Sequence, residues 1–98
     1  MAVIFARIRV SDLSRWHAAF LEAEPIRREH GISARAIYRD AFYDNGLIVV
    51  LEAEDLERAQ AFYSSDEQRQ RMARSGVERP AEMWMGTDFE TPPERGLS

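Results

Sequence analysis

The chain has 98 residues, a formal net charge of −4, no cysteine, and only arginine among its thirteen basic residues. This length suits one domain, and 45% hydrophobic with 31% charged residues is typical of a folded chain. Disulfides, cysteine-ligated zinc, a thiol nucleophile and lysine Schiff-base chemistry are excluded. The acidic balance argues against a nucleic-acid partner, and no apolar run approaches the roughly 18 residues of a membrane span. Because the chain begins without the basic region of a signal peptide, we expect a cytoplasmic protein.

Residues 3–10 are rich in β-branched side chains and partly alternate between apolar and polar, which predicts a strand. A helix should begin at Leu13, because good N-cap residues precede it and an apolar stripe follows. The stripe consists of Trp16, Phe20, Ala23 and Ile26. Pro25 should kink this helix or begin a second one, and His30-Gly31 predicts its end.

Residues 34–43 suit a second strand, and Asp44-Asn45-Gly46 before the apolar run 47–51 predicts a short hairpin. A second helix is expected from Asp55, with a capping box at residues 65–68 that restarts it and carries it to Gly76. Residues 81–85 suit a last strand. We therefore expect a single domain over residues 1–90 and a flexible C-terminal tail over residues 91–98.

The order βαββαβ predicts an α+β, ferredoxin-like fold, with a four-stranded, mostly antiparallel sheet and both helices on one face. The other face would carry Phe5, Ile48 and Val50, which is too apolar for solvent. Two such sheets packed face to face would bury it as a dimeric α/β barrel. We therefore expect a homodimer.

Short segments spread over residues 3–90 carry a family resemblance. They are Val10-Ser-Asp12 leading to Trp16, Gly46-Leu-Ile-Val-Val-Leu-Glu52 leading to Asp55-Leu-Glu-Arg-Ala59, then Phe62, Ser65-Asp66, Met72, and Gly76-Val77 before Pro80-Ala-Glu82. With these the chain resembles the dimeric α/β-barrel superfamily, in the branch of antibiotic-biosynthesis monooxygenases and small cyclases. The resemblance implies a barrel dimer without metal or organic cofactor. Such proteins act on aromatic or polyketide-like small molecules by oxygenation, cyclisation or decarboxylation, and a separate group degrades haem.

His17 and Glu52 are the candidate catalytic residues. His17 follows Trp16 on the helix face expected nearest the strands, where it suits a general acid or base, although it could be a boundary histidine. Glu52 and Arg7 fall on one face of adjacent strands. Glu52 is therefore a candidate proton acceptor, and Arg7 a candidate anchor for a carboxylate or enolate oxygen. The alternative is a structural ion pair, either between the two or across the dimer.

An aromatic set is the candidate substrate-binding surface, although aromatic residues serve equally well as core. It comprises Trp16, Tyr38, Tyr63 and Trp84, with Tyr43 beside them. His30 is better explained by the helix end, and Arg39 and Asp40 by an edge strand. The acidic run over residues 52–57 complements a helix dipole and is not expected to bind a metal, and the resemblance implies that no cofactor is bound.

The resemblance and these residues together predict a cofactor-independent tailoring enzyme, either cyclase-like or monooxygenase-like. It would act by general acid–base catalysis on a small aromatic or polyketide-type metabolite in an apolar pocket. Two alternatives stay open: a non-catalytic dimeric module that binds or stabilises a small molecule, and haem binding through His17 or His30. No nucleic-acid or membrane partner is expected.

Overall fold

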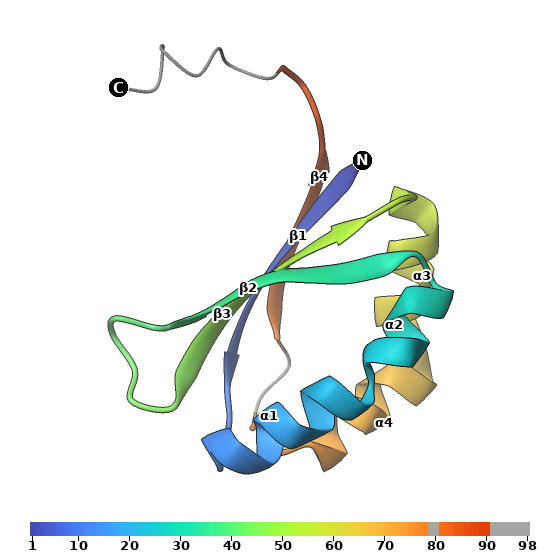
Figure 1. Cartoon of the computed structure of the whole chain (residues 1–98). Coiled ribbons are helices and arrows are strands. Elements are labelled where there is room, and N and C mark those ends of the chain that lie inside the picture. Colours follow the sequence, from blue (N-terminus) through green and yellow to red (C-terminus); the bar gives the residue numbers. More distant parts are fainter. Residues whose placement is uncertain (79–80, 91–98) are drawn as a thin grey trace.

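All the helices of the described residues cover one face of a four-stranded antiparallel sheet (Figure 1). The computed structural model describes residues 1–78 and 81–90. The elements are β1 (Ala2–Arg9), α1 (Leu13–Glu22), α2 (Glu24–Glu29), β2 (Ile32–Arg39), β3 (Gly46–Ala53), α3 (Leu56–Ser64), α4 (Asp66–Arg74) and β4 (Glu82–Thr87). The strand order is β2-β3-β1-β4, with β1 paired antiparallel to both β3 and β4. The predicted ferredoxin-like fold is confirmed.

Capping side chains, a proline and a glycine determine where the helices begin and end. The Asp12 carboxylate accepts a hydrogen bond from the Arg15 backbone N–H at 3.0 Å and so caps α1. Pro25 lies in the first turn of α2, which confirms that it starts a second segment. Gly31 follows α2 at φ +72°, a left-handed conformation that glycine adopts without strain. Ser65 caps α4 by accepting the Gln68 N–H at 3.2 Å, which confirms the N-cap half of the predicted capping box, while the Ser65 N–H donates to the Phe62 carbonyl oxygen instead of to Gln68.

The connection between β2 and β3 is longer than the predicted turn at residues 44–46. Strand β2 spans Ile32–Arg39, so Phe42 and Tyr43 belong to a six-residue loop that reaches Gly46 in β3. Gly46 is not in a left-handed conformation, and a Cβ there would lie 2.8 Å from the Cβ of Asp40. This glycine is needed because the loop packs closely against it. An Asn-Gly pair therefore predicted the reversal but not its geometry.

The core lies between the helices and the helix-facing side of the sheet, which we call the inner face. The predicted alternation in β1 is confirmed, because every second side chain from Ala2 to Val10 is buried. Strand β3 contributes Leu47, Val49, Leu51 and Ala53 to the same layer. From the helices, Trp16, Ala59 and Phe62 complete it. Burial of these apolar side chains is the main source of stability in a domain of this size.

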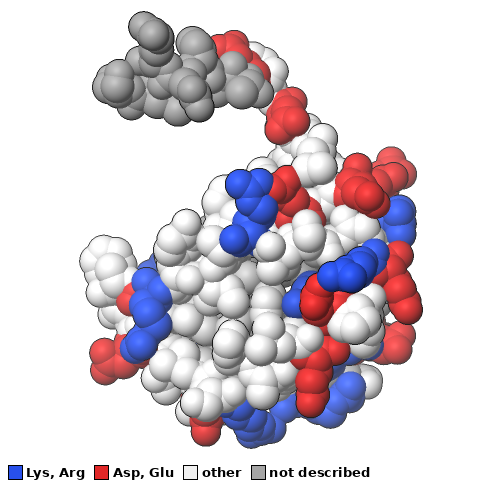
Figure 2. Space-filling model, viewed as in Figure 1, with Lys and Arg blue, Asp and Glu red and all other residues white. Residues whose placement is uncertain are grey.

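The opposite side of the sheet, the outer face, has no helix over it and carries large apolar side chains. Phe5, Tyr38 and Trp84 are 43%, 58% and 55% exposed. Val50 lies opposite Phe5 in the register, and Phe5 in turn lies opposite Trp84. Figure 2 shows a broad uncharged area over the sheet in this view, with charged side chains around its rim.

None of the helices within residues 1–78 and 81–90 is long and apolar enough to cross a membrane. The tail predicted for residues 91–98 lies outside the described residues.

Candidate functional site

The predicted site residues do not lie together. Arg7, Glu52, Tyr38 and Trp84 are on the outer face of the sheet, whereas Trp16 is buried beneath the helices. Tyr63 lies on α3 and packs against the edge of the core. These residues therefore do not form the single pocket that the sequence analysis predicted.

The predicted pairing of Arg7 with Glu52 is wrong. Both side chains are on the outer face, but Arg7 is opposite Ile48 in the register, while Glu52 is opposite Val3. The four-residue offset separates them by about 13 Å along the strands. Arg7 instead donates to Asp40, from Nε to Oδ2 at 2.6 Å, and the Asp40 side chain is only 1% exposed. Asp40 is thus a buried partner and not a solvated edge charge.

The Arg7–Asp40 pair holds the β2–β3 loop against the sheet. Asp40 also accepts the Phe42 N–H at 2.9 Å. The hydrogen bond from Arg7, and then that from Phe42, holds the pKa of Asp40 below its ordinary value of 3.8. The Tyr43 ring lies under the guanidinium groups of Arg9 and Arg7, at 3.5 and 4.9 Å. This cluster is internally satisfied, so we assign it to structure.

Glu52 forms an ion pair with Arg35 across β2 and β3. Both line a shallow outer-face hollow of about 410 Å³, together with Tyr38 and Val50. This hollow faces away from the helices. Glu52 therefore lines the same hollow as Tyr38, and its charge is paired with Arg35 and not with Arg7.

His17 does not face the strands. Trp16 occupies that side of α1 at 5% exposure, and its neighbour His17 is exposed to solvent. The error came from assigning one residue too many to the buried side of the helix, where adjacent positions differ by about 100°. His17 lines none of the hollows within the described residues.

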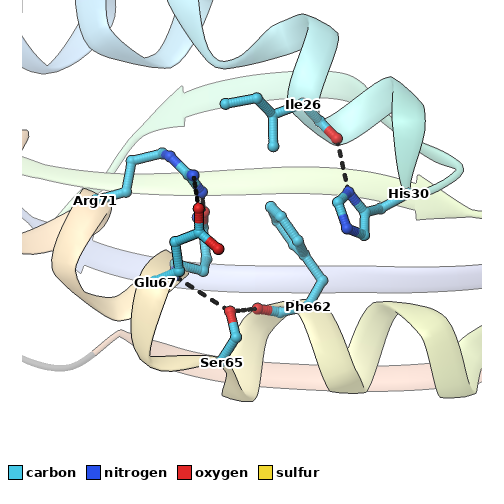
Figure 3. A network of polar contacts seen from close by, with 7 residues as sticks. Ile26, His30, Phe62, Ser65, Glu67 and Arg71 are labelled. Atoms are coloured by element: carbon cyan, nitrogen blue, oxygen red, sulfur yellow. Dashed lines mark hydrogen bonds and ion pairs between the residues drawn. The ribbon is translucent and has the colours of Figure 1, made fainter.

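His30 lies at the end of α2, as predicted. Its Nδ1 donates to the Ile26 carbonyl oxygen at 2.9 Å, and its ring lies 4.5 Å from the Phe62 ring. Figure 3 shows these rings between the helices, with Ser65 on the Phe62 carbonyl and Glu67 beside Arg71. These residues line a hollow of about 450 Å³. Its charged side chains are of both signs.

A smaller cavity lies deeper, between the helices and the inner face of the sheet. This inner chamber, of about 70 Å³, is lined by Ala6, Ile8, Trp16, Ala19, Phe20, Ala23, Arg27, Val49, Gln68, Arg71, Met72 and Ser75. The rings of Trp16 and Phe20 are stacked 4.9 Å apart, and the Arg27 guanidinium lies 3.7 Å from the centre of the Phe20 ring. Its walls are apolar apart from these few polar side chains, as in most small-molecule sites.

A larger groove meets the chamber at Met72, which lines both. This β4 groove, of about 670 Å³, is lined by Tyr63, Arg69, Met72, Ala73, Val77, Glu78, Ala81 and Met83. Burial raises the pKa of Tyr63 to about 12. Its hydroxyl therefore stays protonated at any ordinary working pH and can donate a hydrogen bond.

Sequence reasoning missed Arg27, the least expected residue of the chamber. Arg27 is 5% exposed, and the desolvation that accompanies burial lowers its pKa. It follows Trp16, Phe20 and Ala23 at spacings of four, three and four, so it continues the apolar stripe of α1. A charged residue at an apolar position of the stripe was the sequence signal that could have identified Arg27 as a candidate site residue.

No group of three or more His, Asp or Glu side chains within residues 1–78 and 81–90 is arranged to hold a metal ion.

Comparison with known proteins identifies the fold and nothing finer. No family model matches the chain, and no curated protein matches it. Solved structures do match. One is a protein from Bordetella bronchiseptica named for antibiotic biosynthesis monooxygenases, with TM-score 0.71, 15% identity, and coverage of 91% of this chain and 97% of that one. SnoaB, a cofactor-independent oxygenase from Streptomyces nogalater, gives TM-score 0.69 at 14% identity over 94% and 96%.

A third structure, Rv0793 from Mycobacterium tuberculosis, gives TM-score 0.64 at 13% identity, covering 94% of this chain and 98% of that one. These identities are too low to transfer an activity, but the agreement extends over nearly the whole of each chain. The protein thus has the ferredoxin-like fold of the proteins named for antibiotic biosynthesis monooxygenases.

Proposed function

We propose that the protein is a cofactor-independent enzyme of the antibiotic biosynthesis monooxygenase kind, acting on a small aromatic or polyketide-type molecule. The observation that carries this proposal is the pair of cavities that meet at Met72 between the helices and the sheet. A groove of about 670 Å³ is in the range that holds a drug-sized ligand. SnoaB, which shares the fold, is named a cofactor-independent oxygenase, and this supports the assignment.

General acid–base catalysis suits the groups that line the β4 groove. Val77 and Met83 provide apolar walls for a flat ring, while Tyr63 and Glu78 provide a neutral hydroxyl and a carboxylate. In our proposal Glu78 removes a proton from a carbon that is conjugated with a carbonyl. The electron pair then moves onto the carbonyl oxygen, and the Tyr63 hydroxyl stabilises the resulting oxyanion by a hydrogen bond.

Proton exchange tests this chemistry without knowledge of the natural product. Anthrone carries acidic C–H protons on the ring carbon opposite its carbonyl, with which that carbon is conjugated through the aromatic rings. Their replacement by deuterium can be followed by NMR in D₂O under nitrogen. We expect the protein to accelerate this exchange. Tyr63→Phe and Glu78→Gln should each lower the rate by a factor of about 10² to 10⁴, the usual effect of losing a positioned acid or base.

The matched controls are His17→Ala and Glu52→Gln, the two catalytic residues predicted from the sequence. Because His17 is exposed and Glu52 lies on the outer face, we expect both variants to keep the exchange rate. If either control variant lost the exchange activity, the residue replaced in it would be identified as catalytic. No acceleration by the wild-type protein would overturn the acid–base proposal.

The oxygenase and cyclase forms of the proposal differ in their use of oxygen. An oxygenase consumes oxygen once the carbanion has formed, whereas a cyclase needs only the proton transfers. Oxygen uptake with anthrone in air, compared with buffer alone, separates the two. Exchange without uptake favours a cyclase-like reaction, and uptake above background favours a monooxygenase-like one.

We also propose that the protein is a homodimer joined through the outer face. The register places Ala36, Val50, Phe5 and Trp84 in one apolar row that crosses all four strands. Large exposed apolar patches mark interaction sites in most soluble proteins. A second copy presents the same patch, so a two-fold interface would cover both faces at once. The chamber and groove lie on the other side of the sheet and would stay open in such a dimer.

A further inference from the structure

Arg27 is a buried cation that lies against the Phe20 ring and lacks a hydrogen-bond acceptor at Nε. Its residue is 5% exposed, and its Nε has no hydrogen-bond partner in the structure. Within residues 1–78 and 81–90, no carboxylate forms an ion pair with it. A charge removed from water without a compensating partner destabilises a protein. A ligand that supplies the missing acceptor would explain why an arginine is tolerated there.

The charge on the chamber walls has one sign. Its ionisable lining residues are Arg27 and Arg71, and no aspartate or glutamate lines it, although the whole chain carries −4. Arg71 is already engaged, because it donates to Gln68 and lies 3.6 Å from Glu67. Arg27 is therefore the cation that an incoming anion would meet.

The size of the chamber limits what can enter it. An engineered cavity of about 150 Å³ holds benzene, and the chamber, at about 70 Å³, is less than half that size. A carboxylate fits such a space and an aromatic ring does not. The body of a larger ligand must therefore lie outside the chamber.

Two neighbouring hollows touch the chamber, one at Met72 and one at Arg71. Arg71 is held by two side chains, and the hollow beyond it is lined by charged groups such as Glu29 and Arg58. Met72 has a flexible, unbranched side chain and leads to the apolar β4 groove. The apolar part of a ligand is accommodated on the Met72 side.

We propose that the inner chamber binds the carboxylate group of an aromatic carboxylic acid, with Arg27 as its partner and the ring in the β4 groove. This inference rests on the proposed function and names its substrate class. The planar guanidinium can donate from two nitrogens to both carboxylate oxygens. Phe20, stacked 3.7 Å below the guanidinium, keeps its plane in place for that contact.

Binding can be measured with Trp16, whose ring is stacked on Phe20. Trp84→Phe leaves Trp16 as the single tryptophan, because the chain contains two. The probes are 5-phenylpentanoate and 5-phenylpentanamide, which have similar shape but differ in charge. We expect saturable quenching and at least tenfold tighter binding of the carboxylate. Each methylene placed in the groove should add roughly fourfold in affinity, so acetate should bind far more weakly.

Arg27→Gln in the same background should reduce the affinity for the carboxylate to that for the amide. The matched control is Arg28→Gln, which removes an exposed cation from the next position of α2 and should keep the preference. Circular dichroism and thermal unfolding establish that both variants are folded. Val77→Trp, which fills the groove, should lower the affinity for 5-phenylpentanoate more than the affinity for acetate.

Three results would overturn the inference: equal affinity for acid and amide, a preference that survives Arg27→Gln, or no saturable binding at millimolar probe. These results are separate from catalysis. Proton exchange on anthrone without a carboxylate preference would leave the proposed function in place and remove this inference. A carboxylate preference that is lost in Arg27→Gln, without any catalysed exchange, would support this inference and remove the proposed catalytic function.

Discussion

Arg27 is the residue at which stability and function are expected to conflict. Replacing a buried charge by an apolar side chain of similar length removes a desolvation penalty. We therefore expect Arg27→Met to raise the free energy of unfolding by about 1 kcal/mol in urea denaturation, while carboxylate binding is lost. The contact with Phe20 is retained in part, because methionine packs well against aromatic rings.

Arg28→Met is the corresponding control at an exposed site. It removes only the surface pair with Glu24 and should change the free energy of unfolding by less than about 0.5 kcal/mol. A loss of more than about 1 kcal/mol in Arg27→Met would instead identify Arg27 as a structural residue.

Asp40 makes the stability of the domain depend on pH. Its pKa is held below the ordinary value of 3.8 in the folded state, chiefly by the Arg7 hydrogen bond. A depressed carboxyl pKa contributes stability that is fully present above 3.8 and is lost as the pH falls through the folded-state pKa. We expect Asp40→Asn to lower Tm at pH 7, and the difference from wild type to shrink below pH 3.8. A difference that stays constant down to pH 2 would contradict this linkage.

At the scale of elements, the break between α3 and α4 depends on one side chain. Ser65 accepts the Gln68 N–H and donates to the Phe62 carbonyl oxygen at 2.7 Å, so it serves the end of one helix and the start of the next. Ser65→Ala should lower the free energy of unfolding by about 1 kcal/mol, the usual cost of losing an N-cap. Ser64→Ala, at an exposed position one residue earlier, should change it by less than half as much. Equal effects in both would show that the cap is not the cause.

At the scale of the whole molecule, the outer face is expected to decide the oligomeric state. Val50 lies in the apolar row between Ala36 and Phe5 and has no helix over it. Val50→Glu would place a charge in each half of a two-fold interface without entering the core. We expect the wild-type protein to sediment as a dimer at micromolar concentration, and the variant as a monomer or in a less stable state.

Leu21→Glu introduces the same charge on α1, where the side chain is 56% exposed, and should leave the sedimentation of the dimer unchanged. A wild-type protein that sediments as a folded monomer would refute the predicted assembly.

Much of the fold could be predicted because its signals are local. The alternation over residues 2–10, the Asp12 and Ser65 caps, Pro25 and Gly31 each act within a few residues, and the structure confirms them. The β2–β3 loop was mispredicted because Gly46 serves a long-range contact with Asp40 instead of a local turn. The buried face of α1 was predicted to within one position. Trp16 is buried as predicted, whereas His17, which was expected to face the strands, is exposed.

The candidate site could be predicted only in part, since a cavity forms from elements that are distant in sequence. Trp16 and Tyr63 were identified from residue type, and each lines one of the cavities that meet at Met72. Arg27, Glu78 and the separation of Arg7 from Glu52 depend on how α2, β4 and the strand register come together.

The sequence by itself determined the order of strands and helices, the helix ends and the absence of cysteine and lysine chemistry, because periodicity, capping and composition need no partner distant in the chain. Only the tertiary structure decided which charges are satisfied. Asp40 pairs with Arg7, Glu52 pairs with Arg35, and the Nε of the buried Arg27 has no hydrogen-bond acceptor. The physical reason is that desolvation and hydrogen bonding depend on three-dimensional distance, and register shifts of a few residues change the partner of every charge on a sheet.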